Sequence, residues 1–448
     1  MRVEPSAMPI AAPTMTSQPT AINASFDSAR THAPSSKTDI TVIGAGIVGV
    51  CSALALQRAG LKVSLLDASG AGAGASYGNA GLISTGSCIP ISLPGMVWQV
   101  PRWLLDPSGP LALRPAYALQ SFPWVWKWLR ASAPSTVTRA SAALNALHSC
   151  ALSRYEDLLG ADTYRRLIVQ NGQLHVWSHN AKSNKADALV AQLRAQHGVR
   201  IAQVSGAELH NRMPELADHV SAGICFTEHA NTVSPLALTQ ALLAQFEANG
   251  GKLQIRSIQR IEPARNGYRL WTSAGELHSD RVVVAAGAHS AELLRPLGVH
   301  IPLEFERGYH VELPQPGVTV PQPFIYKDKA VAVTPMANGL RFAGTVEIAG
   351  LRHPPDPRRV ESILHTAREL FPGIRTEGAR SWFGLRPSTP DSVPVIDLAA
   401  RYPGLYMACG HGHTGMTGAP MTGALIAQLV TGQASGLNAA DYALDRFA

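Results

Sequence analysis

The sequence predicts an α/β protein of more than one domain, and three observations support this fold class. The chain has 448 residues, of which 46% are hydrophobic and 15% charged, so it exceeds one ordinary domain of roughly 100–200 residues and can bury a sizeable core. A strand, a helix and a second strand are predicted in succession between residues 39 and 67, which is the order of a βαβ unit. Further apolar strand patterns recur along the chain as far as residue 408. We therefore expect a parallel sheet covered by helices, together with a second domain.

The charge and the cysteines exclude two classes of function. The formal net charge of +7 could suggest a polyanionic partner, but Lys and Arg are scattered and no basic run contains interleaved aromatic residues, so we expect no nucleic acid. The cysteines are odd in number, far apart, and show neither a C-x-x-C pair nor metal-ligand spacing with histidine. We therefore expect no bound metal and a reducing, cytoplasmic location. The cysteines are Cys51, Cys88, Cys150, Cys225 and Cys409.

Residues 1–37 are predicted to form a disordered leader. They are rich in Ala, Pro, Ser and Thr and contain no apolar stretch long enough for a signal-peptide core. An organelle transit peptide would share this composition, although Arg2 and Arg30 form no amphipathic basic helix. Nothing later in the chain approaches the about 18 consecutive apolar residues that a membrane-spanning helix needs.

The N-terminal βαβ unit carries a glycine-rich motif. Ile40–Ile43 is predicted to be a short buried strand that runs directly into Gly44-Ala45-Gly46-Ile47-Val48-Gly49. A helix is predicted over Val48–Ala59, with Gly60 as the residue best able to take the left-handed cap. A second strand follows at once and ends at Asp67. A G-x-G-x-x-G motif in this context predicts a dinucleotide-binding unit of the Rossmann type.

Each residue type in the motif has a physical role. Gly44 permits the tight turn, Gly46 lets the backbone approach the pyrophosphate, and Gly49 allows the helix to pack closely on the strand. The helix N-terminus offers free N–H groups to the anion, and the Asp67 carboxylate can accept hydrogen bonds from both ribose hydroxyls. The alternative is a glycine-rich turn in an ordinary βαβ unit. The residues predicted to bind the dinucleotide here are Gly44, Gly46, Ile47, Val48, Gly49 and Asp67.

A run of small residues after Asp67 favours FAD over NAD. Ala71–Gly81 suits a backbone that lies against a second face of an extended cofactor and its flavin ring, although a flexible surface loop would have a similar composition. Strands are also expected at Gly251–Ile255, Ile258–Ile261 and Arg281–Ala288. The candidate cofactor residues of the run are Ser76, Asn79, Ala80 and Gly81.

Three later motifs carry a resemblance to a known family. The expected strand at 281–288 ends in Ala286-Gly287-Ala288, and residues 384–391 read Gly-Leu-Arg-Pro-Ser-Thr-Pro-Asp. Residues 410–417 read Gly-His-Gly-His-Thr-Gly-Met-Thr, before a predicted helix over about 419–430. With these motifs the chain, over about residues 38–435, resembles the D-amino acid oxidase-like superfamily of FAD-dependent oxidoreductases. That group contains glycine oxidase, sarcosine oxidase and bacterial D-amino acid dehydrogenase, and its G-L-R-P-x-T-x-D and G-H-x-x-x-G elements are the specific ones.

The resemblance implies a fold and a cofactor. It implies non-covalent FAD, a Rossmann-type FAD-binding domain of the glutathione reductase-like kind, and an α+β substrate domain with a mostly antiparallel sheet. The FAD domain would comprise residues 38–95, 225–300 and 380–448, and the substrate domain residues 96–224 and 301–379. The N-terminus of the last helix would stabilise negative charge on the flavin. The further implied FAD contacts are Ile258, Ala286, Gly287, Gly412, His413, Thr414, Gly415, Met416 and Thr417.

The resemblance also implies substrate-binding residues. Arg386 would lie over the flavin and hold the substrate carboxylate, because a guanidinium grips a carboxylate in two places. Tyr326 would help to bind the same carboxylate, and Tyr309 occupies a tyrosine position of D-amino acid dehydrogenases. His411 would shape the flavin electronics or accept the ammonium proton, as would His413. The alternatives are a salt bridge for Arg386, core packing for the tyrosines and a structural role for the histidines.

Within the family the chain looks most like the bacterial D-amino acid and D-hydroxyproline dehydrogenases, through Gly78–Ser84, Pro94-Gly95 and Pro110–Pro115. The implied reaction is loss of an ammonium proton, hydride transfer from Cα to flavin N5 and hydrolysis of the imino acid. The implied substrate is a small D-amino acid such as D-alanine or D-hydroxyproline, and the electrons would pass to a quinone-type acceptor. The alternatives are an oxygen-reducing oxidase of the glycine or sarcosine type, and a non-catalytic flavin-bound subunit of a redox complex.

A tryptophan-rich stretch suggests where a quinone would be met. Indole and cationic side chains together suit the headgroup layer of a bilayer, which would place the protein at the periphery of the inner membrane. Ordinary packing of aromatic helices is the alternative. The residues are Trp98, Arg102, Trp103, Trp124, Trp126, Lys127, Trp128 and Arg130.

Overall fold

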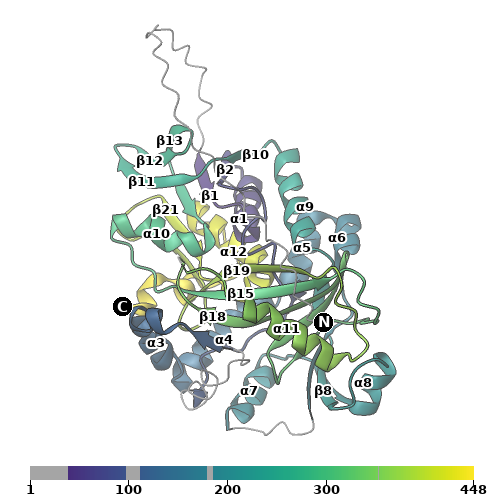
Figure 1. Ribbon diagram of the computed structural model, residues 1–448. Coiled ribbons are helices and arrows are strands. Elements are labelled where there is room, and N and C mark those ends of the chain that lie inside the picture. Colours follow the sequence, from purple (N-terminus) through teal and green to yellow (C-terminus); the bar gives the residue numbers. More distant parts are fainter. Residues whose placement is uncertain (1–38, 97–110, 179–184, 352) are drawn as a thin grey trace, which may run out of the picture. The chain divides into compact units, whose positions relative to one another are not determined.

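The structure is a computed structural model that describes residues 39–96, 111–178, 185–351 and 353–448 (Figure 1). The expected leader, and Trp98, Arg102 and Trp103 of the tryptophan-rich stretch, lie outside the described residues. Residues 37–448 form one compact unit, so the expected division of this unit into two domains at stated boundaries stays a prediction.

A largely parallel sheet contains the expected βαβ unit. Within the described residues its order is β10 (Lys252–Ile255), β2 (Val63–Asp67), β1 (Ile40–Ile43), β14 (Val282–Val284), β21 (Leu405–Cys409) and β20 (Val395–Leu398). Adjacent strands run parallel except β20, which pairs antiparallel with β21. Every residue of β1, β14 and β21 is buried, as expected for strands covered on both faces.

Helices cover one face of this sheet and a small sheet covers the other. Helices α1 (Ile47–Arg58), α9 (Pro235–Ala248) and α12 (Gly415–Thr431) share one core with β1. The other core joins the sheet to β11 (Ile258–Ala264), β12 (Gly267–Thr272), β13 (Gly275–Ser279) and α10 (Ser290–Leu294). This layering agrees with the Rossmann-type FAD-binding fold that the sequence predicts.

A second, mostly antiparallel sheet forms the other part of the compact unit. Its order is β19 (Arg380–Ser388), β15 (Glu304–Leu313), β18 (Gly339–Ile348), β17 (Val331–Met336), β16 (Phe324–Tyr326), β6 (Gln173–Ser178), β8 (Val220–Phe226) and β7 (Ile201–Ser205), and β4 (Leu111–Leu113) pairs with β18. Only the β16–β6 and β18–β4 pairs are parallel among the described strands of this sheet. The expected α+β part with a mostly antiparallel sheet is therefore confirmed.

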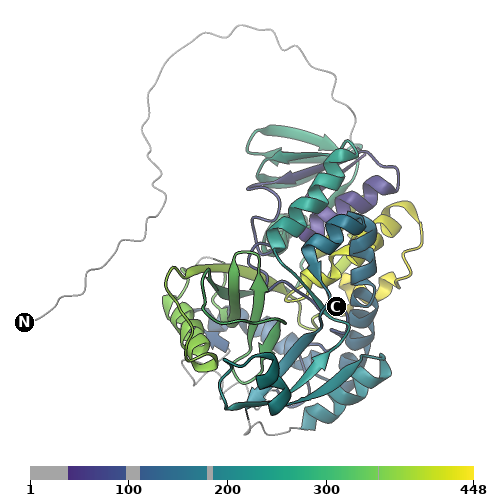
Figure 2. The ribbon, with the colours of Figure 1, turned by 90° about the vertical axis from the view of Figure 1, so that its right-hand side faces the viewer.

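Helix α11 (Pro357–Leu370) covers one face of the antiparallel sheet. It begins where the Asp356 carboxylate accepts the Arg358 N–H, and Pro357 occupies the first turn. Its apolar side packs in one core with Tyr309, Tyr326 and their neighbours. Figure 2 shows this helix, in light green, on the side of the green strands away from the yellow C-terminal segment.

The remaining described elements are a small third sheet, six further α-helices and short 3-10 turns. Strands β3 (Leu82–Ile83), β9 (Ala230–Thr232) and β5 (Ile168–Val169) form a small antiparallel sheet. The further described α-helices are α3 (Ala118–Ala131), α4 (Pro134–His148), α5 (Ala151–Leu159), α6 (Ala161–Leu167), α7 (Lys185–Gln196) and α8 (Gly206–Arg212), and short 3-10 turns lie at Pro115–Tyr117, Gly287–His289, Arg295–Leu297, Ala439–Tyr442 and Leu444–Phe447.

Strand pairing and packing differ from the expected segments in three places. Strand β19 belongs to the antiparallel sheet, although residues 380–448 are assigned to the FAD domain by the sequence. Helices α4 and α5 share the core of α1 and α12, although residues 96–224 are assigned to the substrate domain. The last helix begins at Gly415 instead of about 419, so the end of the 410–417 motif forms its first turn.

Candidate functional site

One large cavity extends from the βαβ turn to the antiparallel sheet. Its volume is about 1860 Å³, and its wall includes Gly44 and Asp67 at one end and Arg386 and His413 at the other. Cavities of roughly 300–1,000 Å³ hold ordinary small ligands. The volume therefore accommodates an extended dinucleotide together with a small substrate.

The glycines of the βαβ turn make the close contacts that the motif predicts. Gly44 has φ +103°, and a Cβ placed there would lie 2.4 Å from the Ala285 carbonyl oxygen. A Cβ at Gly49 would lie 1.8 Å from the Gly44 carbonyl oxygen. Side chains at either position would push apart the strand, the turn and the helix, so both glycines are required by packing.

The side chains around the N-terminus of α1 are held by its backbone. The Asp67 Oδ2 accepts the Ala45 N–H at 2.7 Å, and its Oδ1 accepts the N–H groups of Ser69 and Gly70. The Ser76 hydroxyl accepts the Ile47 N–H at 3.0 Å. Asp67 and Ser76 both line the cavity, so a ligand meets them in fixed orientations.

The motif at 410–417 forms the opposite end of the site. Gly412 donates its N–H to the Pro387 carbonyl at 2.8 Å, which joins the loop to β19. The loop leads into α12, whose N-cap residue Thr414 makes no capping bond with its side chain. Gly415, Met416 and Thr417 of the first turn line the cavity. The positive end of the helix dipole therefore faces the cavity.

Arg386 reaches the cavity from β19. Its Nη1 donates to the Thr345 carbonyl at 3.4 Å and lies 3.4 Å from Nε2 of His413. A Cβ at Gly308, on the adjacent strand, would lie 2.2 Å from Cζ of Arg386, so the guanidinium lies directly over this glycine. Among the described residues no partner contacts its Nε or Nη2, and these N–H groups are free to bind an anion.

Thr345, which accepts from Arg386, has an unusual conformation. It lies in β18 with φ +59°, a region that a β-branched residue rarely adopts and that costs of order 1–3 kcal/mol. Its hydroxyl is buried and, within the described part of the chain, has no hydrogen-bond partner. Thr345 lines the cavity, so an unsatisfied polar group and a strained residue meet beside the guanidinium.

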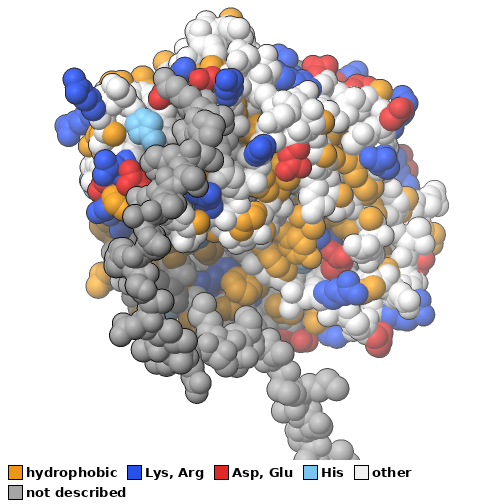
Figure 3. All heavy atoms as spheres, turned by 90° about the horizontal axis from the view of Figure 1, so that it is seen from above, with side chains coloured by type: hydrophobic (Ala, Val, Ile, Leu, Met, Phe, Trp, Pro, Cys, Tyr) orange, Lys and Arg blue, Asp and Glu red, His pale blue; other side chains and the backbone are white. Residues whose placement is uncertain are grey.

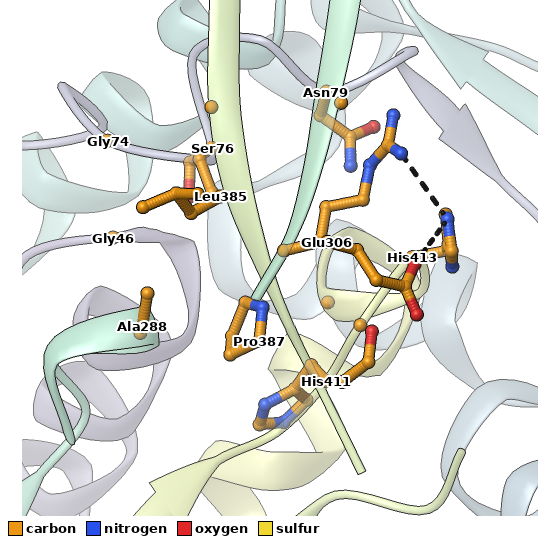
Figure 4. A pocket seen from close by; sticks show the side chains of 18 of the residues that line it. Gly46, Gly74, Ser76, Asn79, Ala288, Glu306, Leu385, Pro387, His411 and His413 are labelled. Carbon is orange, nitrogen blue, oxygen red and sulfur yellow. Dashed lines mark hydrogen bonds and ion pairs between the residues drawn. The ribbon is translucent and has the colours of Figure 1, made fainter. Parts of the chain in front are cut away.

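Glu306 is a carboxylate of the cavity wall that sequence reasoning missed. It lies opposite Arg386 in the β15–β19 register and is 7% exposed. Its Oε2 lies 3.3 Å from Nε2 of His413. Figure 4 shows the Glu306 and His413 side chains pointing toward one another in the pocket.

The electrostatics of this cluster follow from burial. Burial raises the pKa of the Glu306 carboxyl, and the Arg386 guanidinium opposes that rise. The side chain of His413 is 37% exposed; its enclosure by the cavity wall, followed by the Arg386 charge, lowers its pKa. At neutral pH the cluster therefore holds a cation and a neutral imidazole beside a carboxyl group that gains a proton more readily than usual.

His411 is held more tightly than His413. It is 6% exposed, and its Nε2 lies 2.8 Å from the Thr422 hydroxyl of α12. Burial lowers its pKa to about 3, so its imidazole is neutral over the physiological range. His411 lines the cavity, where it can orient a ligand but is poorly suited to accept a proton.

The two predicted catalytic tyrosines do not reach the cavity. Alternation along β15 turns Glu306 and Gly308 toward the cavity and Tyr309 toward α11. The Tyr309 hydroxyl donates to Glu347 and accepts the Asp356 N–H at 2.9 Å. Tyr326 is 2% exposed and bonds to Glu369 at 3.3 Å. Both tyrosines are therefore core residues that do not line the cavity, and their positions do not support a carboxylate-binding role for Tyr326 or a catalytic role for Tyr309.

The structure brings most of the other predicted residues to one cavity. Gly49 and Gly81 lie behind the wall, where a Cβ at Gly81 would lie 2.8 Å from Cε of Met336. The predicted residues that line the cavity are Gly44, Gly46, Ile47, Val48, Asp67, Ser76, Asn79, Ala80, Ile258, Ala286, Gly287, Arg386, His411, Gly412, His413, Thr414, Gly415, Met416 and Thr417.

Aromatic residues of the wall also escaped prediction as site residues. Trp382 lines the cavity and stacks on His310 with ring centroids 5.3 Å apart. A Cβ at Gly78 would lie 1.7 Å from this indole, so the glycine leaves the ring its space. Trp124 and Trp128 of α3 line the cavity as well. Their indoles mark them in the sequence as a cluster, but not as part of a binding site.

Comparison with known proteins places the chain in a family. The model of the FAD-dependent oxidoreductase family, named DAO, matches residues 39–429. The chain belongs to the FAD-dependent oxidoreductase family. The cavity of this family member fits the cofactor, because glycines required by packing bring the backbone to its wall at one end and a helix N-terminus meets it at the other.

Curated relatives cover nearly the same length of sequence. A D-amino-acid oxidase of Bradyrhizobium diazoefficiens is 35% identical over 416 residues, which are 91% of this chain and 98% of the relative. A D-amino acid dehydrogenase of Allorhizobium ampelinum is 28% identical over 91% of this chain and 98% of the relative.

Solved structures show the same fold. Glycine oxidase from Geobacillus kaustophilus matches with a TM-score of 0.66 and 21% identity, over 91% of this chain and 98% of that chain. L-proline dehydrogenase from P. horikoshii matches with a TM-score of 0.68 and 20% identity, over 92% and 98%. At this identity the likeness concerns the fold of the FAD-dependent oxidoreductase.

The described residues contain neither a bilayer-spanning helix nor a cluster of three or more potential metal-binding His, Cys, Asp and Glu side chains. On the face in Figure 3, basic and acidic side chains are interspersed around hydrophobic ones.

Proposed function

We propose that this FAD-dependent oxidoreductase oxidises the Cα–N bond of a small D-amino acid. The observation that carries the proposal is the Arg386 guanidinium, which presents unpaired N–H groups to the cavity. Relatives named D-amino-acid oxidase and D-amino acid dehydrogenase, alignable over about nine-tenths of the chain, support the choice of a D-amino acid.

Arg386 binds the substrate carboxylate through Nε and Nη2. A bidentate pair of this kind fixes the orientation of the carboxylate as well as its position. Gly308 beneath the guanidinium leaves it the space for this pose. Trp382 and the neighbouring apolar wall exclude water from the bound amino acid.

FAD would be held along the remaining wall and, when bound, would supply the acceptor for two electrons from the substrate. Gly44, Gly46 and the α1 N-terminus would hold its pyrophosphate, and Asp67 its ribose. The other residues of this wall that would hold FAD are Ser76, Asn79, Ala80, Ile258, Ala286 and Gly287. The first turn of α12 would stabilise negative charge on the flavin.

The electron acceptor is a quinone met at a membrane surface, and helix α3 supports this. Leu119, Phe122 and Trp126 are 90%, 64% and 55% exposed, and their i, i+3, i+7 spacing puts them on one face of α3. Trp124 and Trp128 of the same helix line the cavity. An exposed apolar face with a cavity-facing side suits a helix that lies in the headgroup layer beside the site.

The test is anaerobic mixing of the FAD-loaded protein with single D- and L-amino acids, including D-alanine and both hydroxyproline epimers. We expect a D-amino acid to bleach the visible flavin band, and a soluble quinone, but not air, to restore it rapidly. Rapid recovery in air would replace the quinone with oxygen as the acceptor. If none of the amino acids tested bleaches the flavin, the assignment of an amino acid as the substrate is wrong.

A variant pair tests the role of Arg386. Arg386→Leu should lower kcat/KM by about 100-fold, because a charged bidentate contact contributes up to about 3 kcal/mol. Arg380→Ala removes an exposed arginine from the same strand and should leave kcat/KM within about twofold of the unchanged protein. Equal activity of the two variants would remove Arg386 from the substrate site.

A further inference from the structure

The cavity wall contains a glutamate side chain, Glu306, to which the proposed binding of the substrate carboxylate by Arg386 assigns no role. Glu306 lines the cavity and faces Arg386 across neighbouring strands. An ionised carboxylate is seldom left buried in a protein without compensation. An amino-acid zwitterion supplies what is missing, because its ammonium group is a cation that arrives beside the carboxylate it brings to Arg386.

His413 separates the two charges. Its Nε2 lies 3.4 Å from Nη1 of Arg386 and 3.3 Å from Oε2 of Glu306, and Figure 4 shows both contacts as dashed lines that meet at this imidazole. In a neutral imidazole the nitrogen either accepts from Arg386 or donates to Glu306. With its single lone pair, Nε2 can accept a hydrogen bond from Arg386, or from Glu306 once that carboxyl group carries a proton. While Glu306 is ionised, the same lone pair faces the carboxylate with no proton between them.

The groups that face Glu306 come from three elements. Strand β19 contributes Arg386 and the Ser388 hydroxyl, and both lower the pKa of Glu306 against the effect of burial. The loop before α12 contributes His413, and β15 itself contributes Glu304, a buried glutamate that does not line the cavity. On its other side, β18 pairs the apolar Ile348 with Glu306. Glu306 is thus the carboxylate of this group that a ligand held by Arg386 can reach.

We propose that Glu306 binds the ammonium group of the substrate and accepts its proton, with His413 as the hydrogen-bond acceptor of the resulting carboxylic acid. This rests on the proposed function and names the residue that recognises the amine. One N–H bond of the ammonium breaks, its electron pair stays on nitrogen, and an O–H bond forms on Glu306. That O–H donates to Nε2 of His413, whose own proton is on Nδ1. The free amine is the form from which oxidation at Cα can proceed.

The proposal predicts that the amine contributes to binding through Glu306. The probes are 2-aminoisobutyrate, a zwitterion without a Cα–H, and isobutyrate, which lacks the amine. Each is titrated into the FAD-loaded protein and followed by the change in flavin absorbance. In the unchanged protein 2-aminoisobutyrate should bind at least about tenfold more tightly, and Glu306→Gln should abolish this preference while isobutyrate binds within about threefold of its original affinity.

Two variants keep the result interpretable. Glu304→Gln removes a second buried carboxylate of the same strand and should preserve the preference for the zwitterion. Glu306→Asp keeps the charge and should retain part of that preference, and it replaces Glu306→Gln if the latter does not hold FAD. Equal weakening of both probes by Glu306→Gln, or an unchanged preference, would overturn the proposal, as would a preference below about threefold in the unchanged protein.

The pH profile gives a second readout. Glu306→Gln has no proton acceptor, so it depends on substrate whose ammonium group has already lost its proton in solution. The acid limb of kcat/KM should therefore move to higher pH by at least about one unit. If Glu306→Gln lowers activity but leaves the acid limb of kcat/KM at the same pH, Glu306 has only a structural role. Failure of the proposed function is distinct, because then no amino acid bleaches the flavin of the unchanged protein.

Discussion

At the scale of the residue, the site depends on small side chains that leave room for large ones. Gly308 lies under Arg386, and Gly78 and Gly384 lie against the Trp382 indole. None of these three needs a left-handed backbone conformation, since none has a positive φ. Their contribution is therefore space, and a single methyl group tests it.

Gly308→Ala should impair substrate binding without unfolding the protein. Its Cβ would lie 2.2 Å from Cζ of Arg386, and the flexible arginine, not the backbone, would move. Because displacement of a positioning group by about 1 Å can cost about 100-fold, we expect kcat/KM to fall by about 10- to 100-fold with FAD content unchanged. Gly373→Ala is the matched control, since a Cβ there meets nothing within 4 Å. Unchanged kcat/KM in Gly308→Ala would show that Arg386 tolerates another pose.

At the scale of the element, helix α3 has one face that packs on the protein and one exposed apolar face. The Trp124 indole donates to the Ser388 carbonyl at 3.1 Å, and Lys127 donates to the Phe447 carbonyl at 2.7 Å. These bonds fix the helix against β19 and the C-terminal end of the chain. Its exposed apolar residues are thereby held in place on the helix whose other side lines the cavity through Trp124 and Trp128.

Replacing those residues should separate chemistry from membrane contact. Leu119→Gln, Phe122→Gln and Trp126→Gln together should preserve flavin reduction by the amino acid within about twofold, since these side chains face away from the cavity. Turnover with a quinone carried in anionic phospholipid vesicles should fall by about tenfold or more, because the apolar area that enters the headgroup layer is lost. Ile255→Ser alters an exposed apolar residue of β10 and controls for surface change. Equal vesicle-coupled turnover in the triple variant would exclude α3 as the membrane contact.

The elements also show what a sequence can and cannot predict. The strand at Ile40–Ile43 and the helix after it are confirmed, because their glycines, apolar run and terminal cap are local signals. The roles of Glu306 and Tyr309 were only partly predictable. In β15 the even-numbered positions are polar or glycine and most odd-numbered positions are apolar, so the alternation assigns Glu306 and Tyr309 to opposite faces. All ten residues are nevertheless buried, so nothing local tells that the polar face meets a cavity.

At the scale of the whole molecule, buried neutral histidines link stability to pH. His148, His229, His310 and His411 are each at most 6% exposed. Burial lowers the pKa of His148 and His310 to about 4, and that of His229 and His411 to about 3. The unfolded chain, with histidine pKa values near 6.5, binds protons that the folded protein does not. The free energy of unfolding must therefore fall as the pH drops below about 6.5.

The melting temperature should reflect this linkage. Below about pH 6.5, each of these histidines lowers the free energy of unfolding by up to about 1.4 kcal/mol per pH unit. For a chain of this length, the four together should lower Tm by about 5 °C between pH 7.5 and pH 5.5. The measurement is thermal unfolding with excess FAD at both pH values. His229→Gln should reduce the change of Tm with pH. His365→Gln, which replaces an exposed histidine of α11, should leave that change as it is. A Tm that is equal or higher at pH 5.5 would contradict this account.

The strand order of the parallel sheet has a consequence for biosynthesis. Strand β14 lies between β1 and β21, so the two neighbours of this strand are translated far apart. The glycine-rich turn after β1 is synthesised long before residues 410–417 add their part of the cavity wall. If that cavity holds FAD as we propose, a chain that is cut before residue 405 should not retain the cofactor.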